Sequence, residues 1–442
     1  MQSSESSNLP SRAAVSADAA ATATERTGRW IVFFVWIFRI IVGVTFILSG
    51  ITKLVDLWGT VFKIEDYLNV WQWDIPRTVV LMGAMALSTF EFVSGLLLLS
   101  GCYRRVLTWL VAMLMTGMLV LTAYIWYADP VSDCGCFGDF IILSNGATFA
   151  KNVVLMAMIV YLIRYNSRGT SLFKAPIQWI VVTVAVFYSI TISLVGFNIQ
   201  PLLDFRPYPV GTPLLGDEQA DDDVRFVYSR DGVEEVFGSD QLPDEDAGWT
   251  YVRRIEPDDA GDKTLTAYDP VTGEDVTYDY LEGADSLLIL VLPEPKRADL
   301  SNTYLINELS DVIERDGSSM VALLATSDRG IERWVDHSMA AYPCLRVEDT
   351  SLKQLSRGVM SMVWVTQDTV RWKRTVASIT MDDVDRIVSG KASLSSLAID
   401  GPYQFIRLTV VLGGFLIVLY LLQTIIINTW QLIKHKRASR KH

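Results

Sequence analysis

Six apolar runs, each close to the length that crosses a bilayer, constrain this chain most. A transmembrane helix needs about 20 mainly apolar residues. The runs cover residues 30–51, 78–100, 106–127, 147–163, 177–197 and 406–429. Half of the 442 residues are hydrophobic, which is typical of a protein embedded largely in a membrane. The sequence therefore predicts an all-α membrane part of six spans.

Charge is distributed unevenly along the chain. Residues 199–402 hold 39 of the 50 acidic and 19 of the 38 basic residues, so this segment has a net charge of −20 and the remainder +8. An acidic segment between the fifth and sixth runs predicts one large extramembrane domain. This acidity, without a stripe of basic and aromatic residues, argues against nucleic acid as a partner.

Basic residues between the runs predict the orientation in the membrane. Four groups fall on one side of a six-span arrangement: Arg26 and Arg29; Arg104 and Arg105; Arg164, Arg168 and Lys174; and Lys434, Lys436, Arg437, Arg440 and Lys441. The positive-inside rule makes this side cytoplasmic. We therefore expect a bacterial inner (plasma) membrane protein with both termini in the cytoplasm and the acidic domain in the periplasm.

The predicted organisation has six parts. They are a disordered cytoplasmic tail (1–28), a four-helix membrane domain (29–165), a fifth transmembrane helix (176–198), the acidic domain (199–402), a sixth transmembrane helix (404–430) and a basic cytoplasmic tail (431–442). The first tail is rich in Ser, Ala and Thr and has no apolar run, which is typical of disorder.

The acidic domain shows two patterns. Residues 223–285, including 231–232 and 276–278, alternate apolar and polar residues between turn signals, which predicts β-hairpins. Residues 286–392 follow the order β-α-β-α-β-β-α, which resembles a thioredoxin fold in an α+β domain. The position of that family's Cys-x-x-Cys reads Pro293-Glu294-Pro295-Lys296, and 357–360 lacks its proline. The resemblance implies a domain without catalytic cysteines, which binds a partner or covers the membrane part.

Two of the four cysteines lie one residue apart, in the stretch Asp133-Cys134-Gly135-Cys136-Phe137-Gly138-Asp139. Such thiols form a redox pair, a structural disulfide or part of a metal site. A disulfide across one residue is strained and easily reduced, and Gly135 has the backbone freedom that such a ring needs. A metal site is not predicted, because no histidine or further cysteine lies nearby. Redox function and loop stapling both stay open.

Two ionisable residues lie inside the predicted spans, where buried charge usually marks function. Arg39 and Glu91 are each nine residues from the predicted inner end of their helix, roughly 13 Å at 1.5 Å per residue. Equal depth predicts an Arg39–Glu91 ion pair, which either holds two helices together or belongs to a proton or quinone path. Lys53 and Lys151 are predicted near the cysteines, where they would offset the flanking aspartates.

The stretch 39–53, together with Glu91 and the Cys-Gly-Cys-Phe-Gly-Asp loop, resembles the DoxX family and its relative, the methylamine utilisation protein MauE, over about residues 30–165. The longer layout is similar to DoxX-type proteins of Bacteroidetes. This resemblance implies membrane redox work on thiols. It makes Cys134 and Cys136 the redox pair, supported by Gly135, Phe137, Gly138, Asp139, Arg39, Lys53 and Glu91.

Two functions follow as hypotheses. In the first, the chain exchanges electrons between a periplasmic thiol or disulfide protein and a membrane carrier, for which a quinone is the candidate; the link to methylamine metabolism comes from the resemblance to MauE. In the second, the chain is a non-enzymatic envelope scaffold. Its cysteine pair then staples a loop, and its domain binds another envelope protein. Neither hypothesis needs a tightly bound cofactor, and membrane lipid is a partner in both.

Overall fold

The structure is a computed structural model of the chain. It describes residues 12–131, 134–215, 225–230, 233–238, 243, 249–255, 265–282 and 285–439. Predictions for Asp133, for the turn at 231–232 and for both ends of the chain lie outside these residues. The chain divides into two compact units: unit 1 is Met1–Leu194 with Tyr403–His442, and unit 2 is Val195–Pro402.

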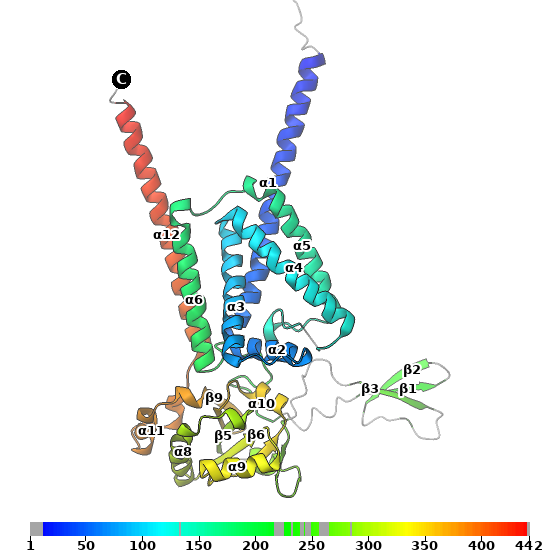
Figure 1. The fold of residues 1–442 in the computed structure, drawn as a ribbon, viewed down its shortest axis with the longest axis vertical. Helices are drawn as coiled ribbons and strands as arrows, with labels where there is room; N and C mark the ends of the chain where they lie inside the picture. Colours follow the sequence, from blue (N-terminus) through cyan, green and yellow to red (C-terminus); the bar gives the residue numbers. More distant parts are fainter. Residues whose placement is uncertain are drawn as a thin grey trace, which may run out of the picture. The chain divides into compact units, whose positions relative to one another are not determined.

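Unit 1 is helical (Figure 1). Its helices are α1 (Arg12–Val55), α2 (Leu57–Val70), α3 (Arg77–Ser100), α4 (Arg104–Ala128), α5 (Asn145–Tyr165), α6 (Gln178–Asn198, ending in unit 2) and α12 (Gly401–Ser439, beginning in unit 2), with short 3₁₀ helices η1 (Gly138–Phe140), η2 (Asn166–Arg168) and η3 (Ala175–Ile177). Within the described parts of the chain, six helices are long and apolar enough to cross a membrane: all of these α-helices except α2. This confirms the six predicted spans.

The N-terminal tail differs from its prediction. Helix α1 begins at Arg12, so residues 12–28, predicted to be disordered, are helical. Seven of the eleven residues 13–23 are alanine. Alanine has the highest intrinsic helix propensity, so this segment extends the helix that the apolar run begins. The lack of an apolar run, which suggested disorder, does not prevent a helix.

Helices α1 and α3 pack closely because glycines remove side chains from their contact. A Cβ added to Gly50 would lie 2.4 Å from the backbone nitrogen of Phe92, and one on Gly95 would lie 2.6 Å from the carbonyl oxygen of Gly43. Small residues of this kind let transmembrane helices approach each other. The contacts fix an antiparallel register, in which Gly43 faces Gly95 and Gly50 faces Phe92.

The remaining spans pair in sequence order. Asn152 on α5 donates a hydrogen bond to the hydroxyl of Thr122 on α4, at 3.2 Å. Helices α6 and α12 are joined by the Tyr188 and Thr409 hydroxyls, which are 2.8 Å apart. The backbone N–H of Lys174, just before α6, donates to the Gln423 side chain of α12 at 2.6 Å. Helix α12 otherwise leaves most of its apolar surface exposed, as a lipid-facing helix does.

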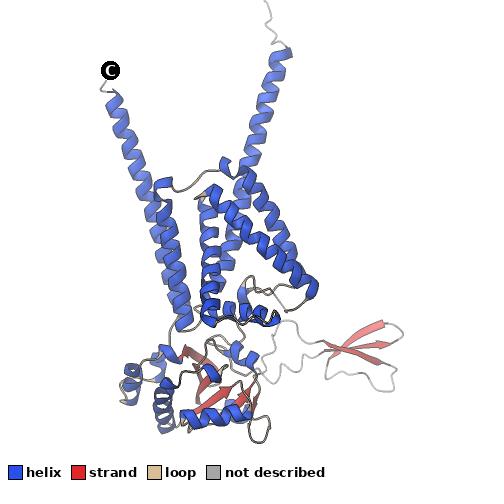
Figure 2. Cartoon of the chain, in the orientation of Figure 1, coloured by secondary structure: helices blue, strands red, loops and turns tan. Residues whose placement is uncertain are grey.

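Unit 2 contains two sheets (Figure 2). The first is antiparallel, in the order β2-β1-β3, with β1 (Arg225–Arg230), β2 (Val233–Gly238) and β3 (Thr250–Ile255). The second has the order β4-β7-β6-β5-β8-β9, with β4 (Ala267–Tyr268), β5 (Ser286–Leu292), β6 (Ser319–Leu324), β7 (Cys344–Val347), β8 (Ser361–Thr366) and β9 (Thr369–Thr375). Strands β5, β6 and β7 run parallel, and β8 and β9 form an antiparallel hairpin beside β5.

Helices connect the strands of the larger sheet. They are α7 (Thr277–Leu281), α8 (Thr303–Arg315), α9 (Asp328–Ser338), α10 (Asp349–Leu355) and α11 (Met381–Val388), with 3₁₀ helices η6 (Pro295–Arg297), η7 (Leu300–Asn302), η8 (Val376–Ser378) and η9 (Leu394–Leu397). Strand β5 is buried on both faces, because Leu288 and Leu290 belong to one apolar core and Leu287 and Ile289 to the other. Burial on both faces explains its uninterrupted apolar sequence.

The strands predicted within 286–392 are present, but two neighbouring predictions are wrong. Residues 223–285 do not form one β-rich part, since β4 pairs with β7 in the larger sheet. Residues 276–278 were predicted as a strand, but Thr277 and Tyr278 are the first residues of α7. The carboxylate of Asp275 accepts hydrogen bonds from the backbone N–H of Thr277 at 3.0 Å and from its hydroxyl at 2.6 Å. Such local bonds favour a helix start over an extended strand.

Candidate dithiol site

Cys134 and Cys136 lie on the loop that joins α4 to α5. Their sulfur atoms are 3.1 Å apart, and both residues are less than a tenth exposed. Gly135 between them has φ +65°, a left-handed conformation that glycine adopts without strain. The N–H of Gly138, also left-handed, donates to the carbonyl oxygen of Gly135 at 3.1 Å. This tight turn places both sulfurs on the same side of the loop.

The loop packs against the membrane helices. Cys134, Cys136 and Phe137 form an apolar cluster with Ile125 of α4. The hydroxyl of Tyr67, from α2, donates to the carbonyl oxygen of Cys134 at 3.1 Å. The cysteine backbone is thus anchored from two helices.

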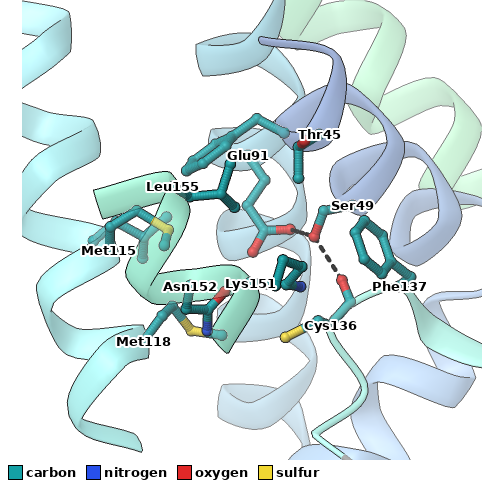
Figure 3. A pocket seen from close by; sticks show the side chains of 12 residues that line it. Thr45, Ser49, Glu91, Met115, Met118, Cys136, Phe137, Lys151, Asn152 and Leu155 are labelled. Carbon is teal, nitrogen blue, oxygen red and sulfur yellow. Dashed lines mark hydrogen bonds between the residues drawn. The ribbon is translucent and has the colours of Figure 1, made fainter. Parts of the chain in front are cut away.

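A polar network inside the bundle holds the loop from the other side (Figure 3). The Nζ of Lys53 lies 2.7 and 2.9 Å from the two carboxylate oxygens of Glu91, and both residues are buried. The Ser49 hydroxyl lies 2.6 Å from the carbonyl oxygen of Cys136 and 2.9 Å from Glu91, with either as its acceptor. Lys53 also donates to Ser49 at 3.1 Å. The Lys53–Glu91 ion pair is therefore connected to the backbone of the dithiol loop.

The predicted Arg39–Glu91 ion pair is wrong. Arg39 is fully buried and donates instead to the side chain of Asn166 at 2.6 Å and to the carbonyl oxygen of Thr170 at 2.7 Å. A Cβ on Gly101, at the end of α3, would lie 3.0 Å from the Arg39 guanidinium.

The glycine contacts between α1 and α3 explain why Glu91 does not pair with Arg39. In the register that they set, Ser49 and Lys53 face Glu91, whereas Arg39 faces the end of α3. Ten residues of helix, about 15 Å, separate Arg39 from Ser49. The prediction took Trp30 as the end of the bundle, but α1 continues beyond the bundle and Arg39 is level with its end.

Cys136 lines a small cavity within unit 1. The cavity has a volume of about 30 Å³, which is room for about two water molecules. Its polar lining comes from Ser49, Glu91, Lys151 and Asn152, which lie around one space in Figure 3. Its apolar lining comes from α1, α4 and α5 and includes Met115, Met118 and Leu155.

Lys151 on α5 lies at this cavity. Its Nζ is 4.3 Å from the centroid of the Phe137 ring, a cation–π distance. Lys151 lines the cavity together with Cys136, and Lys53 donates to Ser49, whose hydroxyl lies 2.6 Å from the carbonyl oxygen of Cys136. Both lysines therefore lie near the cysteines, as predicted. Phe137 thereby contacts the site directly, while Asp139, half-buried on η1, does not line the cavity.

The two thiols have different proton affinities. The hydrogen bond from Cys134 lowers the pKa of Cys136 to about 6; burial opposes this shift, and Lys151 and Lys53 add to it. The same hydrogen bond, together with burial, raises the pKa of Cys134. Proton loss from one member of a close pair makes the second loss harder. The two thiols therefore ionise one after the other, with Cys136 as the more acidic.

The residues that the prediction did not single out are Ser49, Tyr67 and Asn152. Ser49 and Lys53 are four residues apart on one helix, a spacing that places both on the same face. Tyr67 and Asn152 gave no sequence signal, because their roles depend on how α2 and α5 pack. In the described parts of the chain, no three His, Cys, Asp or Glu residues are grouped as metal ligands.

Two segments of the chain are similar to known sequence families. Residues 31–165 match the family described as Methylamine utilisation protein MauE. Residues 223–257, which include β1, β2 and β3, match a Domain of unknown function (DUF8463). No curated protein and no solved structure matches the chain. The chain is a multi-pass membrane protein whose segment 31–165, with the dithiol loop and the Lys53–Glu91 pair, is similar to MauE.

Proposed function

We propose that this chain is a thiol–disulfide exchange protein of the bacterial inner membrane, with Cys134 and Cys136 as its redox pair. The observation that best supports this proposal is the 3.1 Å distance between the two sulfur atoms, on a turn held by Ser49 and Tyr67. A disulfide bond is about 2.05 Å long, so closing it needs a movement of only about 1 Å.

The exchange uses both cysteines. One thiolate attacks a sulfur of a partner disulfide; a mixed S–S bond forms, and the electron pair of the broken bond leaves on the partner's second sulfur. The other cysteine then loses its proton and attacks its neighbour, which releases the partner's first sulfur. The chain loses two electrons and two protons to the partner, and the oxidised pair can return through the reverse sequence with a partner dithiol.

A quinone is the proposed membrane carrier, taking two electrons and two protons to become a quinol. The cavity beside Cys136 is far too small for a quinone ring, so a quinone would approach from the lipid side of the bundle. The similarity to MauE supports a role in methylamine metabolism, through maturation of a disulfide-rich protein in the periplasm. The DoxX relationship stays part of this proposal.

Unit 2 would bind the partner. Its parallel β5 and β6, joined through α8 and followed by the antiparallel pair β8–β9, support a thioredoxin-like fold. The segment after β5 carries no cysteine, and Cys344 is buried, with burial raising the pKa of its thiol to about 12. We therefore assign no redox step to unit 2.

Helix α9 offers the surface for that binding. One pocket of about 320 Å³ has the acidic residues Asp328, Glu332 and Asp336 at its edge. Another pocket, of about 400 Å³, is lined by the basic residues Lys296, Arg333 and His337. Charges of opposite sign on the two sides of one helix favour a single orientation of a docked protein.

A second candidate function is that of an envelope scaffold. One observation favours it: unit 2, in its described residues, contains no cysteine pair that could pass electrons onward. In this case Cys134 and Cys136 form a permanent structural disulfide that holds the loop, and α9 binds another envelope protein.

A mixed-disulfide trap tests the proposal. Tagged Cys134→Ala and Cys136→Ala chains are expressed singly, and covalent adducts are identified on non-reducing gels by mass spectrometry. We expect an adduct with one single variant and none with the double variant. Cys344→Ala serves as the matched control and should not alter adduct formation. No adduct, together with a wild-type pair that is always oxidised, would establish the scaffold instead.

A further inference from the structure

We propose that Lys151, and not Lys53, is the positioning residue that holds the Cys136 sulfur as a thiolate and so makes it the attacking sulfur. This inference deepens the proposed exchange function and rests on it. Two lysines lie beside the dithiol and have different partners. Lys53 pairs with Glu91, and Lys151 contacts the ring of Phe137.

The charge of Lys53 is already compensated. Both carboxylate oxygens of Glu91 lie within 2.9 Å of its Nζ, and Ser49 accepts a third hydrogen bond. A buried ion pair with satisfied hydrogen bonds is close to neutral for its surroundings. Lys53 and Glu91 therefore act on the sulfurs mainly as a dipole.

The charge of Lys151 has no such partner. Within the described part of the chain Lys151 forms no ion pair, and its contact is the ring of Phe137. A cation–π contact orients the ammonium but carries no counter-charge. The lysine and Cys136 line the same cavity of about 30 Å³, so few water molecules fit between them.

Two charged residues beside the loop do not line the cavity: Lys63 of α2, whose Cγ would lie 3.2 Å from a Cβ on Gly135, and Asp139 on η1. Helices α1 and α3 contribute Lys53 and Glu91, which cancel, and the loop contributes the thiol of Cys134. Helix α4 lines the cavity with Leu114, Met115 and Met118, and the α2 hydroxyl of Tyr67 bonds to the backbone. Among the charged side chains that line this cavity in the described part of the chain, Lys151 is the one without a counter-ion, and a thiolate on Cys136 would supply one.

This arrangement has a redox consequence. Oxidation removes the thiolate and leaves the Lys151 charge uncompensated, so Lys151 stabilises the dithiol relative to the disulfide. A pair whose reduced form is stabilised is the stronger oxidant. Removing the charge should therefore make the disulfide harder to reduce, by the same factor as it weakens thiolate formation.

The test measures the ionisation of Cys136 in the purified full-length chain. Cys134→Ser leaves Cys136 alone in the loop, and iodoacetamide alkylation of its peptide is followed against pH by mass spectrometry. Adding Lys151→Met should raise the midpoint by about one pH unit, a tenfold loss of thiolate below the midpoint. Lys151→Arg should restore most of the shift, and Lys174→Met, at the opposite end of the bundle, should have no effect.

Two further variants separate the lysines. Lys53→Met with Glu91→Gln removes both charges of the ion pair and should shift the midpoint much less than Lys151→Met. A larger shift from this double variant than from Lys151→Met would overturn the inference. In the chain with both cysteines, Lys151→Met should lower the equilibrium constant for reduction by glutathione about tenfold, which corresponds to about 30 mV for two electrons.

The experiments can refute the role of Lys151 without refuting the exchange function, and the reverse. The alkylation profile needs no partner protein, so an unchanged profile in Lys151→Met refutes the role of Lys151 even if mixed disulfides form. A shifted profile without any mixed disulfide in cells refutes the exchange function and keeps the thiolate assignment.

Discussion

Replacing Gly50 by alanine should separate helices α1 and α3. The added Cβ would lie 2.4 Å from the backbone nitrogen and 2.7 Å from the Cα of Phe92. Ordinary contacts begin near 3.4 Å, and backbone atoms cannot rotate away as a side-chain end can. The helices must therefore part by about 1 Å, at the level where Ser49 and Lys53 meet Glu91.

Overpacking of this kind costs about 1–3 kcal/mol. The Tm of unit 1 should fall by about 2–4 °C for each kcal/mol, measured by thermal unfolding in detergent. Gly83→Ala is the matched control, because Gly83 lies on α3 and its added Cβ meets no atom within 4 Å. Alanine there should be neutral or stabilise by about 0.5–1 kcal/mol, through its higher helix propensity.

Equal Tm values for Gly50→Ala and Gly83→Ala would refute the close packing of α1 on α3. They would also remove the explanation for the partner of Glu91, since that explanation depends on the same register. A second readout follows from the position of Ser49 beside Gly50. Displacing α1 should loosen the bond from Ser49 to the carbonyl oxygen of Cys136 and speed alkylation of that cysteine.

Two further predictions concern other contacts. Tyr67→Phe removes the hydrogen bond to the carbonyl oxygen of Cys134 and should lower the free energy of unfolding by about 0.5–1.5 kcal/mol. The freed loop should let Cys134 be alkylated faster than in the wild type. Unchanged alkylation would contradict the anchoring role of Tyr67. In unit 2, Arg206 and Lys373 outweigh burial and hold the pKa of Asp204 at about 2, below its ordinary value. A carboxylate with a lowered pKa contributes stability above its unfolded pKa, near 4, and that contribution is lost as the pH falls toward 2. Wild-type unfolding should show this loss and Asp204→Asn should not, and identical acid profiles would exclude it.

The sequence predicted elements better than contacts. The six spans follow from run length alone, and the strands of the larger sheet from their apolar sequence. The partner of Glu91 could not be predicted in this way, because it depends on the register that Gly43, Gly50 and Gly95 set between α1 and α3. Similarly, the cysteine pair was evident, whereas its contact with Tyr67 depends on where α2 packs. The different partners of Lys53 and Lys151, Glu91 and the Phe137 ring, required the actual distances.

The two ends of unit 2 lie next to each other. A Cβ on Gly401 would lie 2.6 Å from the carbonyl oxygen of Leu202, so the chain enters and leaves this unit at neighbouring points. Helices α6 and α12, which lead into and out of it, are joined by hydrogen bonds of their own. The acidic domain is thus an insertion into a helical hairpin, and its exchange for another domain would leave that hairpin closed. Unit 2 can therefore change during evolution without disturbing the helices on either side of it.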